Sequence, residues 1–406
     1  MNQLDAIALH WRRAPRRWGH PLHSLCSYFA MFPPHVPRVF IEWLTRSGDV
    51  VYDPFSGRGT APLEACRLGR LGFGSDANPL ACVLTAAKVD PPEINHIEAR
   101  LLDIRRSVPS SNPKGVHPDI RMLYAPDTLR QLCWLRDTLN LHDRTDVFIM
   151  ATVLGMLHAN YKPGSPPRGF SISMPNTFSM APAYIRKYID QHHLKPPVVD
   201  VFDMIDKKVK RLNLPNVNAT RGMAWQADAR EPMLPFQKPV RLVFTSPPYL
   251  SVIKYGKYNW IRLWMLKYEP RQIDAGLVAT SSINRYLEFM KGLLLSMASV
   301  LSSNGYLSLM IGDVADKRSG LSTNLAERVW KDAAQSLGWR RLGIVNDHLP
   351  VQHKVSRIWG HQKKGAATKV DRILILAPPN TSHTLPPTPA GFSWNSANHW
   401  SEQGRS

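Results

Sequence analysis

Seven short apolar segments, separated mostly by stretches with helical periodicity, constrain the fold of this chain more than any other feature. The predicted strands are residues 50–55, 71–75, 223–227, 240–245, 306–312, 341–345 and 372–376. Strands that alternate with helices favour a parallel, doubly wound α/β sheet, in which ligands bind at the carboxyl ends of the strands. Four polar residues lie at such ends: Asp53, Asp76, Asp228 and Ser246. A single acidic residue after a strand is often a turn former, but four in register predict a site.

The first predicted strand runs into a glycine-rich turn, DPFSGRGT at residues 53–60, and then into a helical pattern. Glycines let the backbone approach a ligand, and the start of a helix offers unpaired N–H groups to an anionic group. Asp76 stands at the tip of the second predicted strand, where ribose hydroxyls are usually bound. A dinucleotide fingerprint needs a third glycine where this chain has Pro62, which argues against a nicotinamide cofactor.

A second motif, Ser246-Pro247-Pro248-Tyr249, follows the apolar run at residues 240–245. Proline fixes φ and lacks an N–H, so the proline pair predicts a rigid turn whose carbonyls only accept hydrogen bonds. Such a surface suits an amino group. A flat base could stack on Tyr249 while its exocyclic amine donates to the Ser246 hydroxyl and the Pro247 carbonyl. Ordinary strand-to-loop exits contain the same residue types, so this motif needs the glycine-rich turn as a second signal.

Together the two motifs resemble those of the S-adenosylmethionine-dependent amino DNA methyltransferases, in particular the SPPY-bearing cytosine-N4 group. DPFSGRGT corresponds to the glycine-rich cofactor motif of that family and TSPPY to its catalytic motif. Residues 226–230 resemble the third cofactor segment, with Asp228 placed to reach the adenine amino group. Residues 23–35 resemble the element that closes over the methionine end of the cofactor. The resemblance covers residues ~20–90 and ~222–377.

This resemblance implies a seven-stranded, Rossmann-like class I methyltransferase sheet and S-adenosylmethionine as the cofactor. It also implies methyl transfer to the N4 amine of cytosine in DNA, without a covalent intermediate or a metal. The implied catalytic residues are Ser246, Pro247, Pro248 and Tyr249. The implied cofactor-binding residues are Asp53, Phe55, Ser56, Gly57, Gly59, Thr60, Asp76, Asn78, Asp228 and Ala229.

Three alternatives to a cytosine-N4 enzyme stay open at this point. An adenine-N6 DNA methyltransferase fits every element but prefers Asp where Ser246 stands. An RNA amino-methyltransferase ranks below it, because no appended RNA-binding module can be recognised. A non-catalytic DNA-binding protein on the same scaffold is the alternative from a different class, and the intact Gly57, Gly59, Asp76 and Ser246 argue against it.

The charge of the chain favours a polyanionic partner, and double-stranded DNA is the one we expect. Lys and Arg total 51 against 31 acidic residues, which gives a formal net charge of +20. Such an excess implies attraction to nucleic acid. Lys254, Tyr255 and Lys257, after the catalytic motif, are predicted to contact the base and its phosphates. Arg186 and Lys187 lie where aromatic and basic side chains interleave, although a solvated amphipathic helix has the same pattern.

Residues 95–220 interrupt the nucleotide-binding pattern and are too long for a loop in a compact sheet. We expect a mainly helical insertion that is a candidate target-recognition subdomain. Residues 1–94 would hold an N-terminal arm, the cofactor-closing segment and the first part of the methyltransferase domain, residues 221–377 its catalytic part, and residues 378–406 a flexible tail. The Asp228 segment follows the insertion, which departs from the simplest motif order, so the basic connection at residues 348–369 is a rival recognition element.

The apolar content and the cysteine usage of the chain predict its cellular compartment. Apolar residues make up 44% of the chain, enough for a sizeable core, and no run approaches the ~18 apolar residues of a membrane helix. Cys26, Cys66, Cys82 and Cys133 show no paired metal spacing, so they predict reduced thiols in a cytoplasmic protein. The family resemblance adds a cognate restriction endonuclease as a further partner, and the sequence leaves the oligomeric state open.

Overall fold

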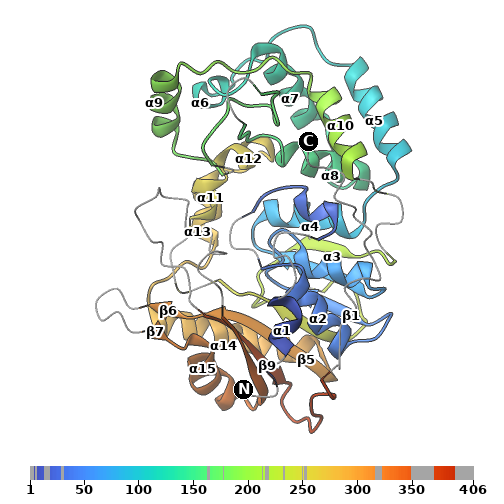
Figure 1. The fold of residues 1–406 in the computed structure, drawn as a ribbon, viewed down its shortest axis with the longest axis vertical. Coiled ribbons are helices and arrows are strands. Elements are labelled where there is room, and N and C mark those ends of the chain that lie inside the picture. The colour runs from blue at the N-terminus through green and yellow to red at the C-terminus, as the bar shows by residue number, and fades with distance from the viewer. Residues whose placement is uncertain are drawn as a thin grey trace.

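A seven-stranded sheet lies in the lower half of the molecule as drawn in Figure 1. The computed structural model describes residues 4, 7–12, 19–28, 32–161, 165–176, 178–212, 214, 219–231, 234–248, 250, 254–315, 322–348 and 370–388. The strands are β1 (Val50–Asp53), β2 (Leu71–Asp76), β3 (Met223–Gln226), β4 (Val240–Thr245), β5 (Leu301–Gly312), β8 (Arg340–His348) and β9 (Val370–Ala377). All seven predicted strands are present with shifted ends, and the expected seven-stranded, Rossmann-like α/β sheet is confirmed.

The strand order is β3-β2-β1-β4-β5-β9-β8. The first five strands run parallel, in the order of a doubly wound fold. The expectation of an all-parallel sheet is wrong for β9, which runs antiparallel to both β5 and β8. Because β8 and β9 are consecutive in the chain and paired, they need no crossover helix, and the strand–helix alternation does not apply to them.

Helices cover both faces of the sheet, which is why its strands read as continuous apolar runs. On one face pack α1 (Ile7–Arg12), α2 (His35–Leu44) and α3 (Thr60–Arg67). On the other face pack α14 (Ile283–Val300) and α15 (Leu325–Val329), followed by a π-helical turn, η3 (Trp330–Ala334), and a 3-10 turn, η4 (Gln335–Leu337). A separate two-stranded ribbon consists of β6 (Val314–Ala315) and β7 (Ser322–Thr323).

A group of helices is inserted between β2 and β3, after α4 (Pro79–Val89). Its members are α5 (Ile94–Arg106), α6 (Pro118–Arg121), α7 (Pro126–Thr138), α8 (Arg144–Leu154), α9 (Pro182–His192) and α10 (Val201–Leu212). Figure 1 shows them at the end of the molecule opposite α14 and α15. They share one hydrophobic core with α4, with α12 (Trp260–Met265) and with Leu22 and Leu25. The helical character of the insertion is as predicted, while the division at residues 94, 220 and 377 stays a prediction.

The first residues of the predicted flexible tail are held against the sheet. Arg340 donates from Nη1 to the Thr381 carbonyl oxygen at 2.7 Å, and the Tyr306 hydroxyl donates to the Thr384 carbonyl oxygen at 3.1 Å. Residues 378–388 are therefore packed rather than flexible, because their carbonyls serve as acceptors for side chains of β5 and β8. Residues 389–406 lie outside the described residues.

Candidate active site

The four polar residues predicted to share a site lie at the ends of four neighbouring strands. Asp53 ends β1 and Asp76 ends β2, while Asp228 follows β3 by two residues and Ser246 directly follows β4. The order β3-β2-β1-β4 places these carboxyl ends side by side. The four residues therefore lie together at the carboxyl ends of the strands, as the strand pattern predicts.

Asp53 is fully buried and connects β1 to β4. Its Oδ1 accepts hydrogen bonds from the Thr245 hydroxyl at 2.6 Å and from the Phe55 amide at 3.1 Å. Its Oδ2 is buried and has no hydrogen-bond partner among the described residues. Burial raises the pKa of Asp53 to about 7, although the two hydrogen bonds favour the ionised form. A buried carboxyl with one open acceptor atom is suited to bind a positively charged donor.

Asp76 joins the tip of β2 to the glycine-rich turn. Its Oδ2 accepts from the Gly57 amide at 3.0 Å, and its Oδ1 accepts from the Asn78 amide at 2.9 Å. Gly57 and Gly59 have φ of 51° and 74°, the left-handed region that favours glycine. Burial raises the pKa of Asp76 to about 6. Asn78 also caps α4, since its Oδ1 accepts from the Leu80 amide at 3.1 Å.

Tyr28 belongs to this site, although the sequence motifs alone do not single it out. Its hydroxyl accepts from Asn78 Nδ2 at 3.0 Å. Its ring stacks against Tyr255, with centroids 6.0 Å apart and an interplanar angle of 25°, and a Cβ added to Gly57 would lie 3.5 Å from that ring. Tyr28 falls inside residues 23–35, the segment that resembles the cofactor-closing element. An aromatic side chain in that segment is the sequence feature that could have identified Tyr28 as a site residue.

Tyr255, which the sequence predicts to contact the base, therefore also lies beside residues that are predicted to bind the cofactor. Burial raises the pKa of Tyr255 to about 12, and the nearby Asp76 carboxylate contributes to that rise. The same two causes, burial first, raise the pKa of Tyr28 well above its ordinary value. Each tyrosine hydroxyl is consequently a neutral hydrogen-bonding group throughout the physiological range of pH.

The remaining residues of the glycine-rich turn have structural partners. Ser56 is buried, and its Oγ accepts from the Thr85 hydroxyl at 3.1 Å. Thr60 begins α3, and its Oγ1 accepts from Arg58 Nε at 3.3 Å. Phe55 packs against a phenylalanine ring of α14, with centroids 5.9 Å apart. These contacts fix the path of the turn, so the backbone of residues 53–60 is held in one shape.

The Asp228 carboxylate already has a strong partner. Arg230 donates from Nη2 to Oδ2 at 2.6 Å and from Nε to Oδ1 at 3.0 Å. These bonds hold the pKa of Asp228 below its ordinary value. The neighbouring Ala229 is buried, and its carbonyl accepts from the Ser296 hydroxyl at 2.7 Å. An amino group that bound Asp228 would share the carboxylate with Arg230.

The motif predicted to be catalytic begins directly after Thr245, the last residue of β4, whose hydroxyl donates to Asp53. Ser246 and Pro248 are half-buried and Pro247 is buried, while Tyr249 lies outside the described residues. Downstream, α11 (Tyr255–Tyr258) packs against α13 (Pro270–Gly276). The Asp274 carboxylate accepts from the amides of Gly256 and Lys257 at 2.7 and 3.0 Å. This pair of bonds fixes α11, while the side chains of Lys254 and Lys257 are exposed.

The residues predicted for target recognition on α9 differ in their surroundings. Arg186 forms an ion pair with Asp119, which ties α9 to α6. Lys187 is exposed. Three aromatic rings follow one another along α9, with centroid separations of 6.2 and 4.4 Å, and they belong to Tyr184, Tyr188 and His192. Most of the rival connection, residues 349–369, lies outside the described residues.

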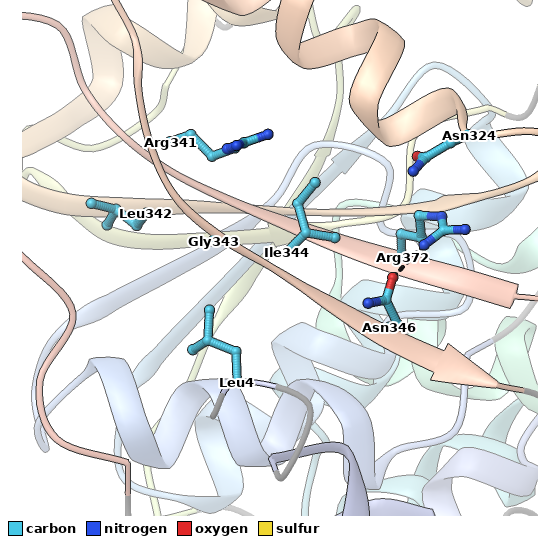
Figure 2. A pocket seen from close by; sticks show the side chains of 8 residues that line it. All are labelled: Leu4, Asn324, Arg341, Leu342, Gly343, Ile344, Asn346 and Arg372. Atoms are coloured by element: carbon cyan, nitrogen blue, oxygen red, sulfur yellow. Dashed lines mark hydrogen bonds between the residues drawn. The ribbon is translucent and has the colours of Figure 1, made fainter. Parts of the chain in front are cut away.

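A cavity of about 560 Å³ lies elsewhere, beside the edge strand β8 (Figure 2). Figure 2 shows Arg341 and Ile344 of β8 among the side chains that line it, and Arg372 hydrogen-bonded to Asn346. None of the residues predicted for the cofactor, catalysis or substrate lines this cavity. This cavity is therefore separate from the candidate site at the carboxyl ends of β3, β2, β1 and β4.

Metal ligands and membrane-spanning helices are both lacking in the part of the chain that the structure describes. There, no group of three or more His, Cys, Asp and Glu side chains could hold a metal ion. Within the same residues, no helix has both the length and the apolar character needed to cross a membrane. All four cysteines are free thiols.

Comparison with curated proteins finds local similarity to two Type II methyltransferases. The chain is 28% identical over 83 residues to the Type II methyltransferase M.MjaII of Methanocaldococcus jannaschii, covering 20% of this chain and 16% of that protein. It is 32% identical over 89 residues to the Type II methyltransferase M.MvaI of Kocuria varians, covering 21% and 20%. The matches thus span a fifth or less of these relatives, and no family model matches the chain.

Comparison with solved structures finds matches with low TM-scores. A proposed DNA modification methylase from Thermus thermophilus, solved with S-adenosyl-L-methionine, is 23% identical with a TM-score of 0.24, over 39% of this chain and 54% of that one. An rRNA methyltransferase from Streptomyces viridochromogenes is 11% identical with a TM-score of 0.34, over 90% and 95%.

Proposed function

We propose that this chain is an S-adenosylmethionine-dependent DNA methyltransferase that methylates the exocyclic N4 amine of cytosine. One observation carries the proposal above the others. The hydrogen bond between the Thr245 hydroxyl and Asp53 joins the start of the glycine-rich turn to the start of the SPPY motif. A cofactor-type turn and an amine-accepting turn therefore stand on adjacent strands, β1 and β4. The local similarity to Type II methyltransferases supports the same class.

The residues at the strand ends fit the chemical groups of S-adenosylmethionine. The unpartnered Oδ2 of Asp53 is an acceptor for the ammonium group of its methionine part. Asp76, fixed by the Gly57 and Asn78 amides, is an acceptor for ribose hydroxyls. Asp228 would accept from the adenine amine alongside Arg230. The ammonium group, the ribose hydroxyls and the adenine amine of the cofactor would thus each have a carboxylate acceptor at the ends of the strands.

When bound, S-adenosylmethionine supplies an electrophilic sulfonium methyl group. The residues of the chain act on the target amine, whose lone pair is delocalised into the base and is a poor nucleophile. The Ser246 hydroxyl and the Pro247 carbonyl accept hydrogen bonds from the two amine hydrogens and favour a tetrahedral nitrogen. Tyr249 stacks on the base. Because the prolines and the Thr245–Asp53 bond fix this turn, its acceptors are preorganised, which is the main source of rate enhancement in such chemistry.

The neutral hydroxyl of Ser246 favours cytosine-N4 over adenine-N6. Adenine enzymes of the resembling family usually carry a carboxylate at this position, whereas a hydroxyl places no negative charge beside the base. Pocket shape also contributes to the choice of base. DNA is the expected carrier because a base must be turned out of the duplex to reach such a site, and the net charge of +20 attracts the phosphates.

Transfer of a radiolabelled methyl group to mixed-sequence genomic DNA tests the proposal. We expect label in DNA and none in total RNA. Ser246→Ala should lower the rate about 10²-fold or more while cofactor binding is kept, since the lost acceptor acts mainly in the transition state. Ser303→Ala, at an exposed serine of β5, is the matched control. Label in RNA alone, or an equal loss in the control, would contradict the proposal.

A further inference from the structure

A buried lysine of the insertion binds the segment that carries Tyr28. Lys208 of α10 is 7% exposed. Its Nζ donates to the Leu25 carbonyl oxygen at 2.6 Å and lies 3.5 Å from the Thr152 carbonyl oxygen of α8. The lysine and its main acceptor are 183 residues apart in the chain. This contact therefore links the insertion directly to residues 20–28.

A buried arginine from the other half of the chain binds the same segment two residues further on. Arg262 of α12 is 2% exposed. Its Nη2 donates to the Ser27 hydroxyl at 2.9 Å, while its Nη1 and Nε donate to Asn259 Oδ1 at 2.8 Å and to the Leu154 carbonyl oxygen at 3.2 Å. The planar guanidinium thus joins residues 20–28, α8 and α12 in one fixed geometry.

The backbone of α8 is shaped to admit this contact. Gly155 caps the C-terminus of α8. A Cβ at that position would lie 1.9 Å from the Leu25 carbonyl oxygen and 2.7 Å from Lys208 Nζ, which is closer than side-chain atoms ever approach. The absence of a side chain at Gly155 is what lets Leu25 and Lys208 meet against the helix end.

Burying the Lys208 ammonium group at this position costs free energy of folding. Its acceptors, the Leu25 and Thr152 oxygens, are neutral carbonyls rather than a carboxylate. Burial first, with smaller contributions from Arg211 and Arg262, lowers its pKa from the ordinary 10.5 to about 8. A buried cation without an acidic partner destabilises a fold, and an apolar residue of similar volume is often neutral or stabilising instead. Local rules of this kind are broken mainly at functional sites.

The held segment leads directly into Tyr28, which hydrogen-bonds Asn78, stacks on Tyr255 and lies over Gly57. We infer that Lys208 and Arg262 are positioning residues for the cofactor: by fixing residues 25–27 they hold Tyr28 over the glycine-rich turn. The inference rests on the proposed binding of S-adenosylmethionine. It makes the helical insertion a part of the cofactor site, in addition to its predicted role in target recognition.

The test is the affinity of the full chain for S-adenosylmethionine, measured by calorimetry. Lys208→Met removes the donor and keeps the apolar stem, so we expect affinity to fall about tenfold without a lower melting temperature. Lys207→Met, at the exposed neighbour on the same helix, is the matched control and should bind normally. Gly155→Ala displaces Leu25 without changing any charge and should weaken binding in the same way.

A double-mutant cycle separates positioning from general support of the fold. If Lys208 acts through Tyr28, then Lys208→Met should weaken binding little further in a Tyr28→Ala background, because the two effects are coupled. Normal affinity in Lys208→Met, or an undiminished effect in the Tyr28→Ala background, would overturn the inference while leaving the proposed function intact. Failure of the unmodified chain to bind S-adenosylmethionine would instead overturn the proposed function, and this inference with it.

Discussion

Replacing Asp53 with asparagine should make the protein more stable at pH 8 and, at the same time, impair its binding of S-adenosylmethionine. Burial raises the pKa of the Asp53 carboxyl from its ordinary 3.8 to about 7 in the folded state. The folded state therefore disfavours the ionised form. The stability associated with this group is full below the unfolded pKa and is lost as pH rises towards 7. The asparagine side chain would be neutral at every pH and would avoid this loss.

The size of the effect follows from the two pKa values. A tenfold change in proton affinity corresponds to about 1.4 kcal/mol, so the rise from 3.8 to about 7 amounts to about 4 kcal/mol at pH 8 and about 2 kcal/mol at pH 5. The asparagine keeps an Oδ1 acceptor for the Thr245 hydroxyl and the Phe55 amide. Its Nδ2 replaces the open Oδ2, so a donor would meet the ammonium group of the cofactor.

Urea denaturation at pH 5 and pH 8, beside calorimetric titration with S-adenosylmethionine, measures both consequences. We expect the free energy of unfolding of Asp53→Asn to exceed that of the unmodified protein, with the larger gain at pH 8. Affinity for the cofactor should fall by about tenfold or more, since a charge-assisted hydrogen bond is lost. A variant that is less stable at pH 8, or one that binds the cofactor normally, would refute this account of Asp53.

Three further predictions concern the cofactor site and the positive charge of the chain. Affinity for S-adenosylmethionine should rise between pH 5.5 and pH 8, because the carboxyls of Asp76 and Asp53 ionise with pKa values of about 6 and about 7 and bind the cofactor as carboxylates; a flat calorimetric profile would remove them from the site. Asp76→Ala should weaken binding by roughly 1.5–3 kcal/mol through lost charged hydrogen bonds, and normal affinity would contradict its role. Affinity for duplex DNA should fall steeply with salt, and Lys187→Ala should make the slope shallower by about one unit; an unchanged slope in a filter-binding titration would exclude Lys187 from the phosphate contacts.

Much of this site is predictable from sequence because it depends on local patterns. Short apolar runs that alternate with helices predict the strands, and parallel strands bring their carboxyl ends together, so Asp53, Asp76, Asp228 and Ser246 could be grouped without coordinates. The antiparallel direction of β9 is not predictable in this way, because strand–helix alternation carries no information about a pair that lacks a crossover. Asp228 and Arg230 are only two positions apart in the chain. The sequence alone still does not predict which donors bind the Asp228 carboxylate.

Contacts between distant segments explain the other differences. The ion pair of Arg186 with Asp119 joins residues 67 apart, and the Lys208–Leu25 hydrogen bond joins residues 183 apart. Helical periodicity indicates that Lys208 lies on the apolar face of α10, because it stands three residues after Ile205 and four before Leu212. A lysine at such a position is most often assumed to extend into solvent. Only the packing of α10 against α8 and residues 20–28 places it inside.

Mass spectrometry of nucleosides from DNA methylated by the purified chain tests the central claim most directly. Genomic DNA of mixed sequence should be incubated with the protein and S-adenosylmethionine, digested to nucleosides and compared with DNA treated with Ser246→Ala. We predict N4-methylcytosine that depends on both the cofactor and Ser246. N6-methyladenine without N4-methylcytosine would contradict the assignment of the base, and no methylated nucleoside from a protein that binds both DNA and cofactor would contradict the catalytic role itself.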